Sequence, residues 1–208
     1  MKKKYLLELI LTAVFILITV LVLTNKMVAF DDYIYNNLFA LRNNFFDFFF
    51  KLITKAGNVT FVICLVITLL LLLDKKNRNL LGINTIVTLL SNQILKNIFR
   101  RKRPAHLRLI KQGGFSYPSG HAMISIAIYG FLIYYASKKI KNKTKKIITI
   151  SLLMFLIIGI GLSRIYVGVH YPSDILSGYI LSTLIFIITE DCYKNHSGGK
   201  KNDKNGSK

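Results

Sequence analysis

The sequence predicts an all-α integral membrane bundle of six transmembrane helices, and three observations lead to this fold class. The 208 residues are 52% hydrophobic, with a positive mean hydropathy. The apolar residues lie in six nearly unbroken runs of about 17 to 20, the length that crosses hydrocarbon at about 1.5 Å per helical residue. Lys and Arg cluster between these runs rather than within them. The runs cover residues 5–24, 56–73, 80–98, 119–136, 147–163 and 173–190.

One membrane domain and a short tail account for the chain. The six runs predict a domain over residues 1–194, and each run should be helical because lipid offers no partner to exposed backbone groups. Residues 195–208 are rich in Lys, Asn, Gly and Ser, which predicts a disordered basic cytoplasmic tail. No small-residue cleavage site precedes Asn25, so the first run indicates an uncleaved span rather than a secretory signal.

The distribution of positive charge predicts the orientation. With the N-terminus in the cytoplasm, 17 of the 29 Lys and Arg residues fall on the cytoplasmic side, as the positive-inside rule requires. We therefore expect a multi-pass plasma-membrane protein with both termini in the cytoplasm. A nucleic-acid partner is not expected, despite the net charge of +20, because the charges form short clusters between apolar runs. Topology does not explain the basic loop 100–111 on the outer side.

The longest segment outside the runs, residues 25–55, predicts an amphipathic helix in the outer interface, between the first and second spans. Asp31 or Asp32 is placed to cap its start. The helix would act as a lid or lipid-entry element, or would only cover the bundle. Packing is favoured because amphipathic periodicity alone cannot separate the two. The apolar residues at helical spacing are Phe30, Ile34, Leu38, Leu41, Phe45 and Phe49.

The third run carries polar residues of two kinds. Asn84, Ser91, Asn92 and Gln93 predict hydrogen bonds between helices, a common use of polar groups in membranes. Lys96 lies at the outer end, just before Arg103-Pro104, and the basic residues between them make this region strongly cationic. Alternatively, Lys96 would only extend its amine to the interface.

The next candidate site is the loop before the fourth run, where Pro118-Ser119-Gly120-His121 fits the start of a helix. Ser is a favoured N-cap, and free N–H groups at a helix N-terminus bind anions. A phosphate could therefore sit on Ser119 and Gly120 with His121 beside it. The alternative is a helix start with a chance His.

The boundary between the last two runs places Arg164, His170 and Asp174 beside hydrocarbon. Ionisable groups are costly there, so a functional site is the default interpretation. The four-residue spacing would let Asp174 bond one imidazole nitrogen of His170 and leave the other free as a nucleophile. Arg164 offers a planar fork for phosphate oxygens. The alternative is a buried Arg164–Asp174 ion pair with a satisfied His.

Taken together, the three blocks resemble the three-part signature of the type 2 phosphatidic acid phosphatase superfamily. Each block is weak, but the ordered set is specific, and all three fall on the same side of the predicted topology. The resemblance covers residues 80–190 and implies a small bacterial six-span member. The matching positions are Lys96, Arg103, Pro104, Pro118, Ser119, Gly120, His121, Ser163, Arg164, His170 and Asp174.

The resemblance also implies roles for individual residues. His170 would attack phosphorus and form a phosphohistidine, with Asp174 orienting its ring. His121 would protonate the leaving oxygen and then activate water. Members of this family generally work without magnesium, so no metal and no cofactor is expected. The phosphoryl oxygens would be held by Lys96, Arg103, Ser119, Gly120 and Arg164.

The expected function is thus a metal-independent phosphatase acting at the outer face on a membrane lipid. Family members act on undecaprenyl diphosphate, phosphatidylglycerol phosphate and phosphatidic acid, so the resemblance implies a lipid phosphate or diphosphate whose tails stay in the bilayer. Two alternatives remain. One is a non-enzymatic protein that binds anionic lipid or transports a solute. The other, more remote, is an enzyme that holds vanadate as the similar haloperoxidases do.

Overall fold

The computed structural model describes residues 2–105 and 108–202, and this part of the chain contains helices and loops but no strand. The predicted all-α class is therefore confirmed. A 3-10 turn, η1 (Thr54–Gly57), and a π-helical segment, η2 (Ile126–Gly130), accompany the α-helices. The α-helices are α1 (Lys2–Leu23), α2 (Val28–Ala40), α3 (Asn44–Ile53), α4 (Val59–Leu72), α5 (Lys75–Phe99), α6 (Gly120–Ser125), α7 (Phe131–Lys139), α8 (Lys143–Tyr166) and α9 (Pro172–Asn202).

Four helical stretches of the described chain are long and apolar enough to cross a membrane. They cover residues 3–23, 120–139, 143–166 and 172–195, and they match the first, fourth, fifth and sixth predicted runs. The third run lies in α5, which has 25 residues, but its Lys, Arg and Asn residues give it a lower hydropathy than the other spans. The count of six spans therefore stays a prediction.

The second predicted run is not one straight helix from residue 56. Helix α4 begins only at Val59 and has 14 residues, about 21 Å, which is shorter than the hydrocarbon core. The side chain of Asn58 caps it by accepting a hydrogen bond from the N–H of Thr60. Together with residues 44–57, from which it is bent by 47°, α4 could form a fifth, broken span.

The segment predicted as a single interfacial helix is two helices, α2 and α3. The break falls where Asn43 adopts an extended conformation and accepts a bond from the N–H of Phe46, because Asn competes for backbone groups and favours caps. The predicted cap by Asp31 or Asp32 is also wrong, since Met27 occupies the N-cap of α2 and Asp31 lies buried in its first turn. An interfacial location stays a prediction.

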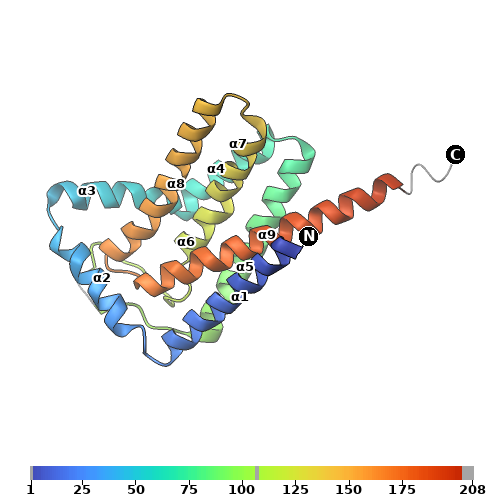
Figure 1. Cartoon of the computed structure of the whole chain (residues 1–208). Helices are drawn as coiled ribbons and strands as arrows, with labels where there is room; N and C mark the ends of the chain where they lie inside the picture. The colour runs from blue at the N-terminus through green and yellow to red at the C-terminus, as the bar shows by residue number, and fades with distance from the viewer. Residues whose placement is uncertain (1, 106–107, 203–208) are drawn as a thin grey trace.

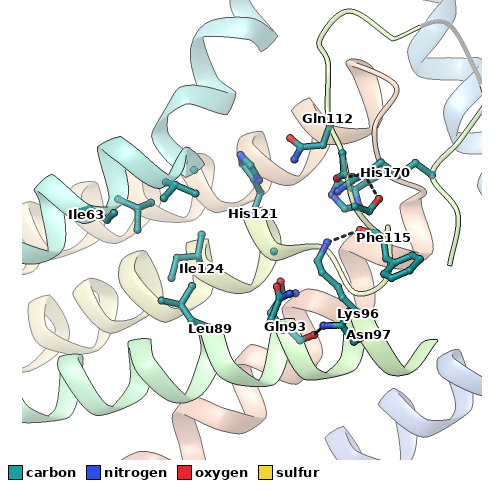
Figure 2. A pocket seen from close by; sticks show the side chains of 18 residues that line it. Ile63, Leu89, Gln93, Lys96, Asn97, Gln112, Phe115, His121, Ile124 and His170 are labelled. Carbon is teal, nitrogen blue, oxygen red and sulfur yellow. Dashed lines mark hydrogen bonds between the residues drawn. The ribbon is translucent and has the colours of Figure 1, made fainter. Parts of the chain in front are cut away.

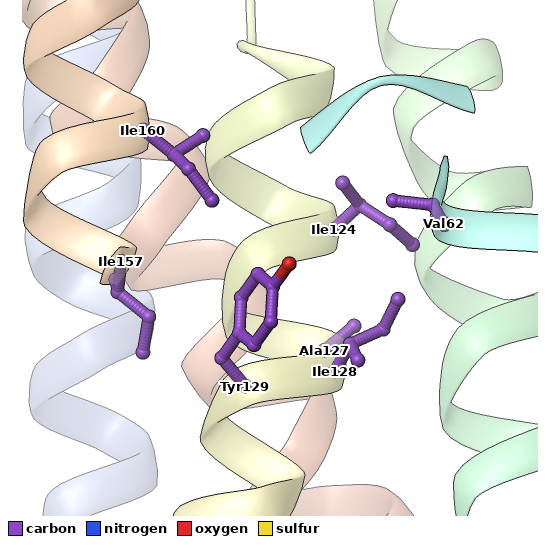
Figure 3. Packing of buried hydrophobic residues seen from close by; sticks show 7 residues of the cluster. All are labelled: Val62, Ile124, Ala127, Ile128, Tyr129, Ile157 and Ile160. Atoms are coloured by element: carbon purple, nitrogen blue, oxygen red, sulfur yellow. The ribbon is translucent and has the colours of Figure 1, made fainter. Parts of the chain in front are cut away.

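The elements α6, η2 and α7 follow one another without a break and form one helical rod, and the hydrophobic core packs around this rod. Helix α9 packs against α1, α5 and α6, and Figure 1 shows α1 running beside α9. Around η2, Tyr129 lies between Ile157 and Ile160 of α8 on one side and Val62 of α4 on the other (Figure 3). The predicted polar contact of Asn84 is confirmed, because its amide donates to the Ala127 carbonyl at 3.0 Å. This bond ties α5 to the irregular part of the rod.

The tail prediction for residues 195–208 concerns the end of α9. The helix continues to Asn202, so the first residues of that stretch extend it. Residues 203–208 lie outside the described part of the chain. The disordered tail stays a prediction.

Gly178 marks the closest approach of α9 to the start of α6. A Cβ at this position would lie 2.9 Å from the Ser119 carbonyl oxygen and 3.0 Å from the Cβ of Ala122. Because neither atom can rotate away, we expect Gly178→Ala to lower the free energy of unfolding by about 1–3 kcal/mol. The measurement is the Tm of the protein in detergent.

Gly82→Ala on α5 is the matched control for this prediction. Its Cβ would meet only a Leu70 methyl at 3.9 Å, an ordinary contact, so the variant should keep or slightly raise the Tm. Equal losses in both variants would show that the close approach at Gly178 is not the cause.

Candidate active site

The three sequence blocks meet at one end of the bundle, where α5 and α8 end and α6 and α9 begin. They surround a cavity of about 540 Å³. Figure 2 shows the polar side chains gathered toward one end of this cavity, and Ile63, Leu89 and Ile124 toward the other. Ser119, Arg164 and Asp174 lie behind its wall. The predicted residues that line it are Lys96, Arg103, Gly120, His121 and His170.

The start of α9 fixes the His170–Asp174 pair. Pro172 occupies the first helical position, which its fixed φ suits. Asp174 reaches back to the residue before Pro172, where its Oδ2 accepts a bond of 2.9 Å from the N–H of Tyr171. The same oxygen lies 3.3 Å from Nδ1 of His170 and accepts a short bond from the Ser116 hydroxyl. The carboxylate therefore faces one edge of the imidazole, as the sequence predicts.

The other edge of His170 faces a cation. Its Nε2 lies 3.0 Å from Nη1 of Arg103. A guanidinium can only donate, so Nε2 must be the accepting nitrogen and the proton belongs on Nδ1, toward Asp174. Burial lowers the pKa of His170 from its ordinary 6.5 to about 3, which keeps the ring neutral. A neutral imidazole whose Nε2 carries no proton is the form that acts as a nucleophile.

This buried neutral imidazole makes stability depend on pH. The unfolded chain binds a proton at His170 near pH 6.5, whereas the folded chain does so only near pH 3, so unfolding takes up a proton between these values. The free energy of unfolding should fall as the pH drops from 6.5 toward 3, by up to about 1.4 kcal/mol per pH unit. We expect the Tm of His170→Gln to fall less than that of the wild type between pH 7 and 4.5. Parallel losses would contradict a neutral buried His170.

The predicted helix start at Ser119 is confirmed. The hydroxyl of Ser119 caps α6 by accepting a bond from the N–H of Ala122, and its own N–H donates to the Asp174 carbonyl at 3.1 Å. Gly120 follows in the cavity wall, where a Cβ would lie 3.0 Å from Oδ1 of Asn92. The absence of a side chain at Gly120 therefore keeps the helix N-terminus close to α5 and open to the cavity.

Two predicted cations turn toward loop carbonyls at the cavity wall. The Lys96 amine donates to the Phe115 carbonyl at 2.7 Å. Arg103 donates to the carbonyls of Gly113 at 3.0 Å and Val169 at 2.8 Å. These bonds draw the loop before α6 and the turn before α9 around the same cavity, with two positive charges on its wall.

Arg164 sits one layer further back, near the end of α8. Its guanidinium donates to the Thr54 hydroxyl at 2.8 Å and to the side-chain oxygen of Gln112 at 2.9 Å, and Gln112 lines the cavity. Its Nε is buried without a hydrogen-bond partner in the described part of the chain. The alternative of an Arg164–Asp174 ion pair is wrong, because Asp174 pairs with Arg101.

His121 projects into the cavity from the first turn of α6, and Figure 2 shows it on the same polar end as His170. Gly57 in η1 backs its ring, because a Cβ there would lie 2.8 Å from Cδ2 of His121. The turn that precedes α4 therefore sets the position of this histidine. The predicted segment 25–55 also reaches the site, because its Thr54 accepts a bond from Arg164.

Several residues at the site were missed by the sequence interpretation. Arg101 was counted only as part of the cationic run, and Asp31 only as a possible cap. Ser116 stands two residues before the second block, which is the one local signal that could have singled it out. Thr54 and Gln112 lie in no motif, and their contacts with Arg164 join positions that are 110 and 52 residues apart in sequence.

Comparisons with known proteins agree with the sequence resemblance. Phosphatidylglycerophosphatase B of Bacillus subtilis strain 168 is 34% identical over 103 residues, which are 49% of this chain and 50% of that protein. Undecaprenyl-diphosphatase of Sulfolobus acidocaldarius is 27% identical over 133 residues, 59% of this chain and 60% of that protein. The chain thus spans about half the length of the curated relatives it matches.

A solved structure supports the fold over nearly the whole chain. The crystal structure of a transmembrane PAP2 type phosphatidylglycerolphosphate phosphatase from Bacillus subtilis has a TM-score of 0.81 at 24% identity, covering 90% of this chain and 96% of that one. Aquifex aeolicus LpxE has a TM-score of 0.64 at 23% identity, covering 76% and 92%. The family model of the PAP2 superfamily matches residues 77–197, more than half of the chain and all three blocks. The chain is a multi-pass membrane protein that belongs to the PAP2 superfamily.

Proposed function

We propose that this protein is a membrane phosphatase that hydrolyses the phosphomonoester or diphosphate of a lipid through a phosphohistidine on His170. The observation that carries the proposal is the geometry of His170. Its neutral ring turns Nε2 toward Arg103 in a cavity that Lys96 and His121 also line. A nucleophile that faces one cation, in a cavity lined by a second, is placed to meet a phosphoryl group.

The proposed reaction has two displacements at phosphorus. In the first, Nε2 of His170 forms a bond to phosphorus while the bond to the leaving oxygen breaks and His121 gives that oxygen a proton. In the second, His121 takes a proton from water, the water oxygen attacks phosphorus, and the P–N bond breaks. Inorganic phosphate leaves, and both histidines return to their starting states.

Positive charge around the cavity would stabilise both transition states. Phosphoryl transfer spreads negative charge over the equatorial oxygens, so fixed cations and helix-terminal amides contribute most of the catalysis. Lys96 and Arg103 lie on the wall, and Arg164 has one unused donor. The amide of Gly120 begins α6 beside them, and Ser119 would contribute through its hydroxyl, because its amide is engaged by the Asp174 carbonyl. We propose that these groups hold the phosphate without a metal ion.

The apolar end of the cavity supports a lipid substrate. Ile63 and Leu89 are each about half exposed on α4 and α5, so an alkyl chain could pass from the cavity into the surrounding lipid. The names of the relatives indicate phosphatidylglycerophosphate or undecaprenyl diphosphate as candidates. We further propose six spans, cytoplasmic termini and a site at the outer face.

The experiment that tests the proposal is phosphate release by the purified protein in detergent with excess chelator. The substrates are phosphatidylglycerol phosphate, phosphatidic acid and undecaprenyl diphosphate, each below its solubility limit in mixed micelles. We expect release from at least one of them without added metal, and the rates rank the substrates. Release only after addition of a divalent metal would contradict the metal-free mechanism. No release from any substrate would favour the binding or transport alternative.

A further inference from the structure

Beside the catalytic pair lies a buried polar network that the proposed reaction does not use. It joins Asp31 of α2, Arg101 in the loop after α5, and Ser173 and Asp174 at the start of α9. The side chains of Asp31 and Asp174 are 1% and 0% exposed and that of Arg101 is 17% exposed. Neither Asp31 nor Arg101 lines the active-site cavity. The side chain of Arg101 therefore reaches the catalytic pair through Asp174, and its backbone carbonyl accepts a bond of 2.8 Å from the N–H of Ser116.

Arg101 bridges two carboxylates with the two ends of its guanidinium. Its Nη1 donates to Oδ1 of Asp174 at 2.6 Å and to the Ser173 hydroxyl at 2.8 Å. Its Nη2 donates to Oδ2 of Asp31 at 2.8 Å. The Cζ of the guanidinium lies over the ring of Tyr171, 4.0 Å from the ring centroid. The planar guanidinium of Arg101 fixes the directions of its hydrogen bonds to the two carboxylates, whereas the ammonium group of a lysine would not.

Asp31 holds this bridge in place from the other side. Its Oδ1 accepts a bond of 2.9 Å from the N–H of Ser173, and its Oδ2 accepts one of 2.7 Å from the Ser173 hydroxyl. Both contacts join positions 142 residues apart in sequence. The carboxylate thus anchors α2 to the first turn of α9, one residue from Asp174.

The two oxygens of Asp174 have different tasks. Oδ2 faces the Ser116 hydroxyl, the Tyr171 amide and Nδ1 of His170. Oδ1 is taken by Arg101. Without a partner on Oδ1, the carboxylate would be held on one oxygen only, and the direction of its bond to His170 would be less well fixed.

We propose that Arg101, held by Asp31, is a positioning residue that orients His170 through Asp174. The inference rests on the proposed function and extends it to the helix α2. It explains why an acidic residue of α2 is buried against the start of α9. Arg101 touches neither the cavity nor the proposed phosphate, so its removal should slow the reaction without weakening substrate binding.

The charge of Arg101 also bears on the protonation of His170. The groups that face His170 are Asp174 on α9, Arg103 on the loop, Arg164 on α8 and His121 on α6. Removing the Arg101 charge leaves Asp174 less neutralised, which favours the imidazolium form of its neighbour. The acid limb of the pH profile of kcat/KM should then move toward neutral pH. A residue that only supports the fold would not move it.

The experiment compares four variants on the best lipid substrate. Arg101→Lys keeps the charge but cannot bridge both carboxylates, and Asp31→Asn removes one of them. Matched controls are Arg100→Lys and Asp32→Asn, the same changes at the next positions. We expect the first pair to lower kcat about 10- to 100-fold with KM within about threefold, while the controls stay near wild type. All rates are normalised to the folded fraction in size-exclusion chromatography.

A fifth variant, Arg101→Gln, is measured for the pH profile between pH 4 and 8. We expect its acid limb to rise by about one pH unit, whereas that of Arg101→Lys should stay within a few tenths. If Arg101→Gln does not fold, the kcat of Arg101→Lys and Asp31→Asn decides the matter alone.

Three results would overturn the inference. One is a kcat in Arg101→Lys and Asp31→Asn that matches the controls. Another is a large rise in KM at constant kcat, which would make Arg101 a substrate contact. The third is an unmoved acid limb in a folded Arg101→Gln. Inactive wild-type protein would instead refute the proposed phosphatase, so the two failures are distinguishable.

Discussion

His170→Ala is expected to lower phosphate release by at least about a thousandfold, the size of effect seen when a nucleophile is removed. The reason is that His170 is the histidine of the cavity whose ring is held on both edges, by a carboxylate on Nδ1 and by a cation on Nε2. Nε2 of His170 faces Arg103 at 3.0 Å, and Nδ1 is engaged by Asp174. The measurement is initial-rate phosphate release in detergent, at saturating substrate and with chelator present.

A chemical trap separates loss of the nucleophile from a general loss of structure. With lipid labelled in its phosphate, rapid alkaline quenching of the wild type should leave label on the protein, because phosphohistidine survives base and is lost in acid. His170→Ala should carry none. His196→Ala, the same change in the basic C-terminal stretch outside the three blocks, is the matched control and should behave as the wild type. Label that persists in His170→Ala would place the intermediate on another residue.

Features that depend on neighbours in sequence were predictable. The cap of Ser119 on α6 joins residues three apart, and the Asp174–His170 contact joins residues four apart. Both follow from helix-start chemistry, which a single sequence displays. The long apolar runs likewise predicted the four helices that are long and apolar enough to span, because span length depends on the rise per residue and the thickness of the bilayer.

Features that depend on tertiary contacts were not predictable. Arg164 was an equally good partner for Asp174 on charge alone, but the fold gives that role to Arg101, 73 residues away. Asp31 looked like a helix cap because acidic residues favour helix starts, and only the packing of α2 against α9 shows its use. Periodicity shows which face of a helix is apolar, but it does not show what covers that face.

The break in the segment 25–55 illustrates a third limit. Its apolar spacing suits one long helix, and the register continues across residues 41–43. A local hydrogen bond from Phe46 to Asn43 nevertheless ends that register and starts α3. The new direction lets Phe50 stack on Tyr166, with 4.3 Å between centroids, and brings Thr54 to Arg164. A cap and a few side-chain contacts outweigh a continuous pattern here.

The second large effect is expected at His121, and it should depend on the leaving group. His121→Ala should lower phosphate release from a lipid monoester about 10²- to 10⁴-fold, because an alkoxide leaves poorly unless its oxygen receives a proton. With 4-nitrophenyl phosphate the leaving oxygen belongs to an acidic phenol, which leaves readily as the phenolate without being protonated. The first displacement should therefore stay fast in His121→Ala on that substrate, whereas His170→Ala should be inactive on both.

The second displacement still needs His121 as a base. The His121→Ala variant should therefore complete the first displacement on 4-nitrophenyl phosphate and stall at the second. In a rapid-mixing experiment, His121→Ala should release one equivalent of nitrophenol per active site and then turn over slowly, with labelled phosphohistidine accumulating. Gln93→Ala, which changes another polar residue of the cavity wall, is the control and should show no such burst. A uniform loss on both substrates, without a burst, would mean that His121 only supports the site. The burst followed by slow turnover separates the two roles of His121, because each role acts in a different displacement. In the first, His121 gives a proton to the leaving oxygen. In the second, it removes a proton from the attacking water.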